Sequence, residues 1–317
     1  MDKKSVSVVI PNFNGEWLLQ KYLPPLYEAL KSSSYISDYE IIIIDDASTD
    51  DSVDFLTSHY AKIILLQNNE NSGFSKTTNR GIFAAKMDLA LLLNTDMLLS
   101  NDFFDFLIPY FFANPTLFGI SPDIKNEQGD AFLEMRKIPI MKHNYLHYED
   151  VMSTEAGYSF YLCGGCALID RLKLIKLNGF NELYSPFYFE DTDLSVRAWL
   201  NGWTCMHTPE ISVQHCHSVT IDRYFSEEYV KLIFTRNKLL FNYLYLNGFD
   251  RFRFFQRSYS KYIFGKIFPS KSKTRFNSAF EMCLKMKERK RKRSELRRLG
   301  ADSLNKILSK YFPQSKI

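Results

Sequence analysis

The first hundred residues alternate between two patterns of hydrophobic and polar positions. Short, nearly continuous apolar runs occupy 6–10, 40–44, 63–66 and 89–93. Between them, apolar residues recur at intervals of three or four over 15–30, 50–60 and 75–86. Short apolar runs are typical of strands buried on both faces, and the longer spacing is typical of amphipathic helices. The alternation predicts an α/β fold with a mostly parallel sheet and helices on both faces, the third helix capped by Ser75.

The pattern becomes less regular after residue 97. Apolar stretches at 161–169 and 211–215 predict strands, and Glu190-Asp191 predicts the start of a helix after an aromatic loop. From residue 227 onward the apolar spacing is helical and rich in aromatic residues. We therefore expect an α/β domain over residues 1–240 and a helical, aromatic and basic extension over 241–317.

Polar side chains stand directly after three of the predicted strands. They are Asn12 and Asn14, Asp45 and Asp46, and Asn94 and Asp96. In open parallel sheets, ligands bind beyond the carboxyl ends of the strands. The sequence therefore predicts a binding site at this edge of the sheet.

Composition and charge narrow the class of protein. The chain has 317 residues, 45% of them hydrophobic and 24% charged, which excludes a disordered chain and a disulfide-stapled miniprotein. The net charge of +4 hides a division, since residues 1–250 carry −12 and residues 251–317 carry +16. Five cysteines in so long a chain fit a reducing compartment, and the C-x-x-C of Cys163 and Cys166 is expected to line a core strand. We find no spanning segment and no signal-peptide pattern, and expect a cytoplasmic protein.

Three groups of residues can carry chemistry. Asp96, in Asn94-Thr95-Asp96 at a strand end, can coordinate Mg²⁺ or Mn²⁺ that also binds phosphate oxygens. Such a triplet also forms ordinary turns that bind nothing. Glu190 and Asp191 are candidate acid–base groups or, alternatively, simple helix caps. His215 and His217 follow the last strand, where a histidine is either a metal ligand or a structural residue.

Seven segments, in order, resemble the family 2 glycosyltransferases of GT-A fold, and more closely the rhamnosyltransferase- and galactofuranosyltransferase-like members. The segments are VSVVIPNFNG (6–15), EIIIIDDASTDDS (40–52), NNENSGFSKTTNRGI (68–82), LLLNTD (91–96), CGGCALIDR (163–171), GFNELYSPFYFEDTDLSVRAWLNGW (179–203) and VQHCHSVT (213–220). The resemblance covers about residues 5–240 and implies a Rossmann-like sheet that binds a nucleotide sugar.

The resemblance implies roles for individual residues around the nucleotide. Phe13 matches the aromatic residue that stacks on the base, and Asp46, with Asp45 beside it, matches the acid that hydrogen-bonds a pyrimidine. The full nucleotide-binding set implied is Pro11, Phe13, Asn14, Asp45, Asp46, Gly73, Asn79, Asn94 and Thr95.

The resemblance also implies a metal site and a base. Asp96 matches the last acid of the family's D-x-D, and Asn94 replaces the first, which leaves one carboxylate fewer near the ion. His215 matches the histidine that completes the metal site, with His217 as its neighbour and Ser218 and Thr220 following in the family's order. Asp191 matches the catalytic base, with Glu190 in support.

Two glycines, Gly164 and Gly165, match a segment that borders the acceptor in relatives. Simple packing is the alternative role for these two and for Gly73.

The implied function is an inverting, Mg²⁺- or Mn²⁺-dependent hexosyl- or deoxyhexosyltransferase. It would take a UDP- or dTDP-sugar donor and a glycan or lipid-linked acceptor, in bacterial surface polysaccharide or glycolipid synthesis. The rival from another class is a non-catalytic protein that retains the fold and binds a sugar nucleotide or a polyanion.

The extension interleaves cations with aromatic residues over 251–298, a composition that suits an anionic membrane surface. A solvated helical tail or a dimer contact is the alternative, and the oligomeric state stays open. No nucleic-acid recognition module accompanies the basic run, so we expect no nucleic-acid partner. We expect peripheral contact with the inner face of the cell membrane.

Overall fold

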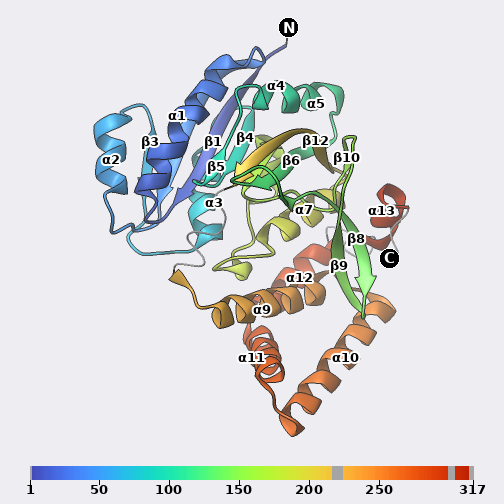
Figure 1. Cartoon of the computed structure of the whole chain (residues 1–317). Coiled ribbons are helices and arrows are strands. Elements are labelled where there is room, and N and C mark those ends of the chain that lie inside the picture. The colour runs from blue at the N-terminus through green and yellow to red at the C-terminus, as the bar shows by residue number, and fades with distance from the viewer. Residues whose placement is uncertain (1, 216–223, 299–303, 314–317) are drawn as a thin grey trace.

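A computed structural model describes residues 2–215, 224–298 and 304–313. A twisted sheet forms the body of the protein, and a group of helices from the end of the chain lies against one side of it (Figure 1). The strands are β1 (Lys4–Asn12), β2 (Ile36–Asp45), β3 (Ile64–Gln67), β4 (Leu89–Leu93), β5 (Met97–Leu98), β6 (Leu117–Asn126), β7 (Phe132–Glu134), β8 (Arg136–Lys142), β9 (Tyr145–Val151), β10 (Gly157–Tyr158), β11 (Cys166–Asp170) and β12 (Thr204–His215).

The helices alternate with the strands in the first half of the chain and dominate the end. They are α1 (Glu16–Ser32), α2 (Ser52–His59), α3 (Phe74–Ala84), α4 (Phe103–Leu107), α5 (Pro109–Ala113), α6 (Arg171–Lys176), α7 (Glu190–Leu200), α9 (Glu227–Tyr245), α10 (Gly248–Ile267), α11 (Lys271–Lys285), α12 (Glu288–Arg298) and α13 (Leu304–Tyr311). The predicted alternation of strands and helices is confirmed.

The main sheet has the strand order β10-β12-β6-β11-β4-β1-β2-β3. Strands β1 to β4, β6 and β12 all run in the same direction, while β11 lies antiparallel between β4 and β6. The mostly parallel sheet is therefore confirmed. Strands β8 and β9 form a separate antiparallel hairpin.

The core lies on both faces of the sheet. In β1, Val6, Val8 and Ile10 point into the cluster that α1, α2 and α4 cover, whereas Val9 points into the opposite cluster with α3 and α7. Because helices cover both faces of the sheet, successive residues of a central strand are buried on either side, which explains the nearly continuous apolar runs.

Two local expectations were wrong, and a third was right but too short. The stretch 161–169 is a strand only from Cys166, because a turn at Gly164-Gly165 precedes it, with the Cys166 N–H donating to the Cys163 carbonyl. Only Cys166 of the C-x-x-C therefore lies in the core strand. The strand predicted at 211–215 is confirmed, and it forms the end of the longer β12. Helix α3 begins after Gly73, whose φ of +81° only glycine adopts readily, and Ser75 makes no capping hydrogen bond.

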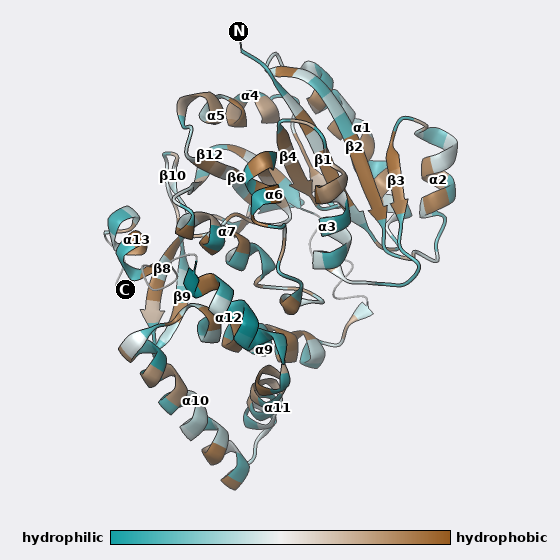
Figure 2. Ribbon diagram, turned by 180° about the vertical axis from the view of Figure 1, so that it is seen from behind, coloured by the Kyte–Doolittle hydropathy of each residue, from teal (hydrophilic) through white to brown (hydrophobic). Residues whose placement is uncertain are grey.

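The terminal helices share one core with the body. Leu240 of α9, Phe254 of α10 and Phe280 of α11 belong to the same apolar cluster as Trp199 of α7. The expected boundary at 240/241 falls inside α9, and we propose that the extension begins after that helix. Helices α10 and α11 project from the body (Figure 1), and α10 alternates hydrophobic and hydrophilic residues along its length (Figure 2). Within the described ranges, no helix has the length and apolar character needed to cross a bilayer.

Candidate active site

A cavity of about 490 Å³ lies at the carboxyl ends of β1, β2, β4 and β12. These strands run in the same direction, so the side chains that follow them gather at one edge of the sheet, as predicted. Of the predicted site residues, the lining includes Pro11, Phe13, Asp46, Gly73, Asn94, Thr95, Asp96, Gly164, Gly165, Glu190, Asp191 and His215.

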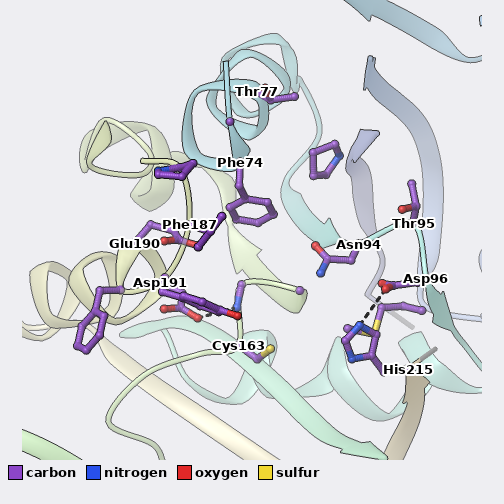
Figure 3. A pocket seen from close by; sticks show the side chains of 18 of the residues that line it. Phe74, Thr77, Asn94, Thr95, Asp96, Cys163, Phe187, Glu190, Asp191 and His215 are labelled. Atoms are coloured by element: carbon purple, nitrogen blue, oxygen red, sulfur yellow. Dashed lines mark hydrogen bonds and ion pairs between the residues drawn. The ribbon is translucent and has the colours of Figure 1, made fainter. Parts of the chain in front are cut away.

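Asp96 and His215 meet at one side of the cavity. Strand β5 pairs with β12 so that His215 lies opposite Met97, which brings the imidazole beside Asp96. His215 Nε2 lies 3.0 Å from Asp96 Oδ2 (Figure 3). Asp96 is 8% exposed, and its other oxygen, Oδ1, is buried without a hydrogen-bond partner. A carboxylate oxygen that lacks a donor, next to an imidazole, is a donor set that suits a divalent cation such as Mn²⁺.

The described residues contain no group of three or more histidines, cysteines or acids that converge as metal ligands. His217, Ser218 and Thr220 lie outside the described residues. No lysine or arginine of the described chain lines the cavity, although several acids do. A polyanion bound in this cavity would therefore need a cation that the described lining residues do not supply.

Glu190 and Asp191 begin α7 on the other side of the cavity (Figure 3). The two residues before them, Tyr188 and Phe189, have left-handed φ angles of 73° and 75°. The buried amide of Asn237 on α9 holds this turn by donating to the carbonyls of Tyr184, Phe187 and Tyr188 at 2.7, 2.8 and 2.9 Å. The position of the acid pair is thus set by a helix that follows it by more than thirty residues.

The two acids have different surroundings. Asp191 accepts hydrogen bonds from the backbone N–H of Thr192 at 2.6 Å and of Gly164 at 3.3 Å. Burial raises the pKa of Asp191, and these two hydrogen bonds oppose the shift because they favour the ionised form. Burial and the neighbouring charge of Asp191 raise the pKa of Glu190 to about 8, and its Oε2 has no hydrogen-bond partner. At neutral pH the pair therefore favours a neutral Glu190 beside an Asp191 equipped to carry the negative charge.

Asp193, two residues after Asp191, faces away from the cavity into the core. It is fully buried and binds Arg197 Nε at 2.7 Å and the Tyr245 hydroxyl at 2.7 Å. Arg197 in turn donates to the carbonyls of Leu177 and Gly179. This network anchors α7 and orients the acid pair without touching the cavity.

Asp46 lines the cavity and holds the loop that follows β3. Its carboxylate accepts hydrogen bonds from Asn68 Nδ2 at 2.6 Å and from the backbone N–H groups of Ser72 and Gly73 at 2.8 and 3.0 Å. Phe13 also lines the cavity, with the Tyr224 ring edge-on at a centroid distance of 5.2 Å.

Three residues of the predicted nucleotide-binding set do not line the cavity. Asp45 accepts from Asn12 Nδ2 and the Ser48 N–H, and Asn14 accepts from the Thr49 N–H. Asn79 binds the backbone of Phe180 through both ends of its amide. These polar groups join elements of the fold, and the structure does not bring the three residues into the cavity lining. Their contact with a nucleotide stays a prediction.

Gly164 and Gly165 lie against the two reactive sides of the cavity. A Cβ on Gly164 would stand 3.2 Å from Asp191 Cβ, and one on Gly165 would stand 2.9 Å from Asn94 Nδ2. Because Asp191 and Asn94 pack so closely against these glycines, a packing role and a position beside the site do not exclude each other.

Sequence reasoning missed several residues of the lining. They include Phe74, Thr77, Glu134, Tyr148, Cys163, Phe187 and Phe234. Glu134 and Tyr148 come from the short hairpins after β6, where no motif or spacing marks them. Tyr161 lines the cavity too, at the start of a stretch that was recognised only for its apolar character.

Comparisons with known proteins bear on the fold and the family. The family model described as glycosyl transferase family 2 matches residues 7–177. An N-acetylglucosaminyl-diphospho-decaprenol L-rhamnosyltransferase of Mycobacterium tuberculosis is 23% identical in an alignment of length 222 that covers 61% of this chain and 72% of the relative.

Two solved structures share the fold at low identity. GalNAc-T7 with UDP, GalNAc and Mn²⁺ gives a TM-score of 0.63 at 16% identity, over 82% of this chain and 51% of that one. Staphylococcus aureus TarS 1-349 with UDP-GlcNAc gives 0.58 at 14% identity, over 98% and 92%. This chain thus spans about half of the GalNAc-T7 chain and most of TarS 1-349.

Proposed function

The chain belongs to glycosyl transferase family 2, and we propose that it moves a sugar from a nucleotide-diphospho sugar to an acceptor hydroxyl with inversion at the anomeric carbon. One observation carries this proposal. The Asp96–His215 pair and the Glu190–Asp191 pair occupy separate sides of one cavity, with Asn94 between them (Figure 3). A leaving diphosphate and an attacking hydroxyl need such separate partners.

Asp96 and His215 would hold Mg²⁺ or Mn²⁺, and the unsatisfied Asp96 Oδ1 fits that role. When bound, the cation supplies positive charge that neutralises the leaving diphosphate. The lack of lysine and arginine in the described lining supports the need for it. The Mn²⁺ named with GalNAc-T7 and the UDP or UDP-sugar of both solved structures support a UDP- or dTDP-sugar donor.

Asp191 would act as the general base. Its carboxylate takes the proton of the acceptor hydroxyl as that oxygen attacks the anomeric carbon, and the bond to the diphosphate breaks in the same displacement. No covalent sugar–enzyme intermediate is required. Glu190, neutral at pH 7, leaves Asp191 as the one anion of the pair, so the proton has a single destination.

The acceptor would be a glycan or lipid-linked sugar, in bacterial surface polysaccharide or glycolipid synthesis. The rhamnosyltransferase of M. tuberculosis is named for such a lipid-linked substrate. The exposed part of α10 supports contact with a lipid surface, since large aromatic side chains and cations gather there. They include Phe249, Phe252, Tyr259, Phe264, Arg253, Arg257 and Lys261. We therefore propose peripheral attachment at the cytoplasmic face of the membrane.

The test is a donor screen across UDP-, dTDP- and GDP-sugars with Mg²⁺ or Mn²⁺, read as release of nucleoside diphosphate in the presence of glycoside acceptors. Asp191→Asn should abolish release while nucleotide binding, measured by calorimetry, stays within about twofold. Unchanged turnover in Asp191→Asn would reject Asp191 as the base. Nucleotide binding without turnover of any donor would favour the non-catalytic binding protein instead.

A further inference from the structure

One wall of the cavity, beside Asp191, carries groups that the proposed reaction does not use. They come from β7, from β9 and from the segment before β11. They are Glu134, Tyr148 and Tyr161. The two tyrosine rings meet edge to face with centroids 4.8 Å apart. The negative charges of Asp191 and Glu134 act on each other, so this wall borders the base.

Lys137 stands behind this wall and outside the cavity lining. It is 4% exposed, its Nζ lies 2.6 Å from Glu134 Oε2, and it also forms an ion pair with Asp150. The same ammonium group lies 5.6 and 5.7 Å from the ring centroids of Tyr148 and Tyr161. Its charge is thus shared by two carboxylates and two rings. Lys137 holds Glu134 in place and is not available to a ligand.

The charge balance at this end of the cavity is negative. The described lining contains Glu134 and Asp191 here, and no lysine or arginine. Among the described lining residues, a phosphate oxygen brought to Asp191 would meet two acids and no lysine or arginine, which disfavours binding. A phosphate is also already ionised at neutral pH and needs no base, whereas a sugar hydroxyl does need one.

We propose that Glu134, Tyr148 and Tyr161 form a subsite for an uncharged sugar ring that carries the acceptor hydroxyl. The rings offer apolar surface to the C–H face of a sugar, and the Glu134 carboxyl and the tyrosine hydroxyls offer partners to its hydroxyl groups. The Glu134 side chain is 34% exposed and is therefore accessible from the cavity. This assignment rests on the proposed function and deepens it, because it names the acceptor class: a sugar hydroxyl, with acceptors that react through a phosphate oxygen excluded.

In the step that this subsite serves, the acceptor oxygen forms a bond to the anomeric carbon. The bond from that carbon to the diphosphate breaks, and the hydroxyl proton passes to Asp191. Glu134 takes no part in the bond changes and is a specificity residue that positions the acceptor.

The experiment uses the full chain with Mn²⁺ and the donor that the screen identifies. Release of nucleoside diphosphate is measured with a panel of octyl glycosides and, separately, with citronellyl phosphate as a short isoprenyl phosphate. We expect glycosides to stimulate release and citronellyl phosphate to leave it at the level seen without acceptor. In Glu134→Gln, the KM for the glycoside should rise about tenfold or more, as expected for loss of a hydrogen bond to a charged group. The donor KM should change less than about twofold.

Asp150→Asn is the matched control, because Asp150 contacts the same lysine and does not line the cavity. Asp150→Asn should alter the glycoside KM less than about twofold. An equal rise of the glycoside KM in Glu134→Gln and Asp150→Asn would assign Glu134 a merely structural role and overturn the subsite. Stimulation by citronellyl phosphate, or a rise in the donor KM alone, would also overturn it while leaving the proposed function intact. Nucleotide binding without stimulation by any glycoside would count against the subsite, and absence of nucleotide binding would remove the proposed function itself.

Discussion

The buried carboxyl group of Glu190 makes the stability of this protein depend on pH. Its pKa is about 8 in the fold against 4.5 in an exposed chain, because burial and the charge of Asp191 disfavour ionisation. Between these two values the folded protein keeps a proton that the unfolded chain has lost. Stability from this group is therefore complete below about pH 4.5 and declines as the pH rises toward 8. One proton of difference corresponds to about 1.4 kcal/mol per pH unit.

Glu190→Gln removes this titration and keeps the shape of the side chain. The free energy of unfolding of the wild type should fall more steeply than that of Glu190→Gln, by about 1.4 kcal/mol for each unit between roughly pH 5 and 7.5. Urea unfolding followed by circular dichroism at several pH values measures both slopes. Glu70→Gln, which removes an exposed carboxyl group, should leave the slope of the wild type unchanged. Equal slopes for the wild type and Glu190→Gln would refute the conclusion that Glu190 is neutral in the fold.

Three further predictions concern the metal pair, the acceptor side and the extension. Asp96→Ala should weaken Mn²⁺-dependent nucleotide binding by at least tenfold in calorimetry, since a cation would lose its carboxylate ligand. Equal nucleotide affinity of the wild type and Asp96→Ala, both with and without EDTA, would contradict this. Gly164→Ala should lower turnover by tenfold or more with little change in nucleotide affinity, because the new Cβ would lie 3.2 Å from Asp191 Cβ. A turnover rate in this variant equal to that of the wild type would show that Asp191 can shift without loss of activity. The double variant Phe249→Ser/Phe252→Ser should lose flotation with anionic liposomes, since both residues are more than 60% exposed on α10. The control Phe83→Ser, at a residue 50% exposed on α3, should still float. Equal flotation of both variants would exclude α10 as the lipid contact.

The sequence was sufficient to predict the parallel half of the fold and the edge that carries the site. Strands β1, β2 and β4 each contain a short apolar run that ends in or just before polar residues, so the pattern alone marks both the strand and its end. The direction shared by parallel strands then brings Asp46 and Asp96 to one cavity. His215 joins them because β12 lies in the same sheet and runs the same way.

Other features could not be predicted, because they depend on contacts between segments distant in the chain. Asn14, Asp45 and Asn79 have the residue types of a binding site, but their amides and carboxylates are used within the fold. Glu134 is an acid in a short hairpin with no motif around it, and it reaches the cavity only because β7 pairs with the end of β6. Residue type therefore identified candidates, and only the packing of the elements shows which of them line the cavity.

The acid pair shows most clearly how a motif depends on the rest of the chain. Tyr188 and Phe189 hold left-handed backbone angles that cost roughly 1–3 kcal/mol each in a non-glycine residue. The three hydrogen bonds from Asn237 offset that cost and fix the turn from which α7 begins. The same turn buries Glu190, which raises its pKa and leaves Asp191 as the anion. The motif thus locates the two acids, while a buried amide on α9 holds the turn that carries them. The terminal helices that pack against α9 therefore support the position of the acid pair as well.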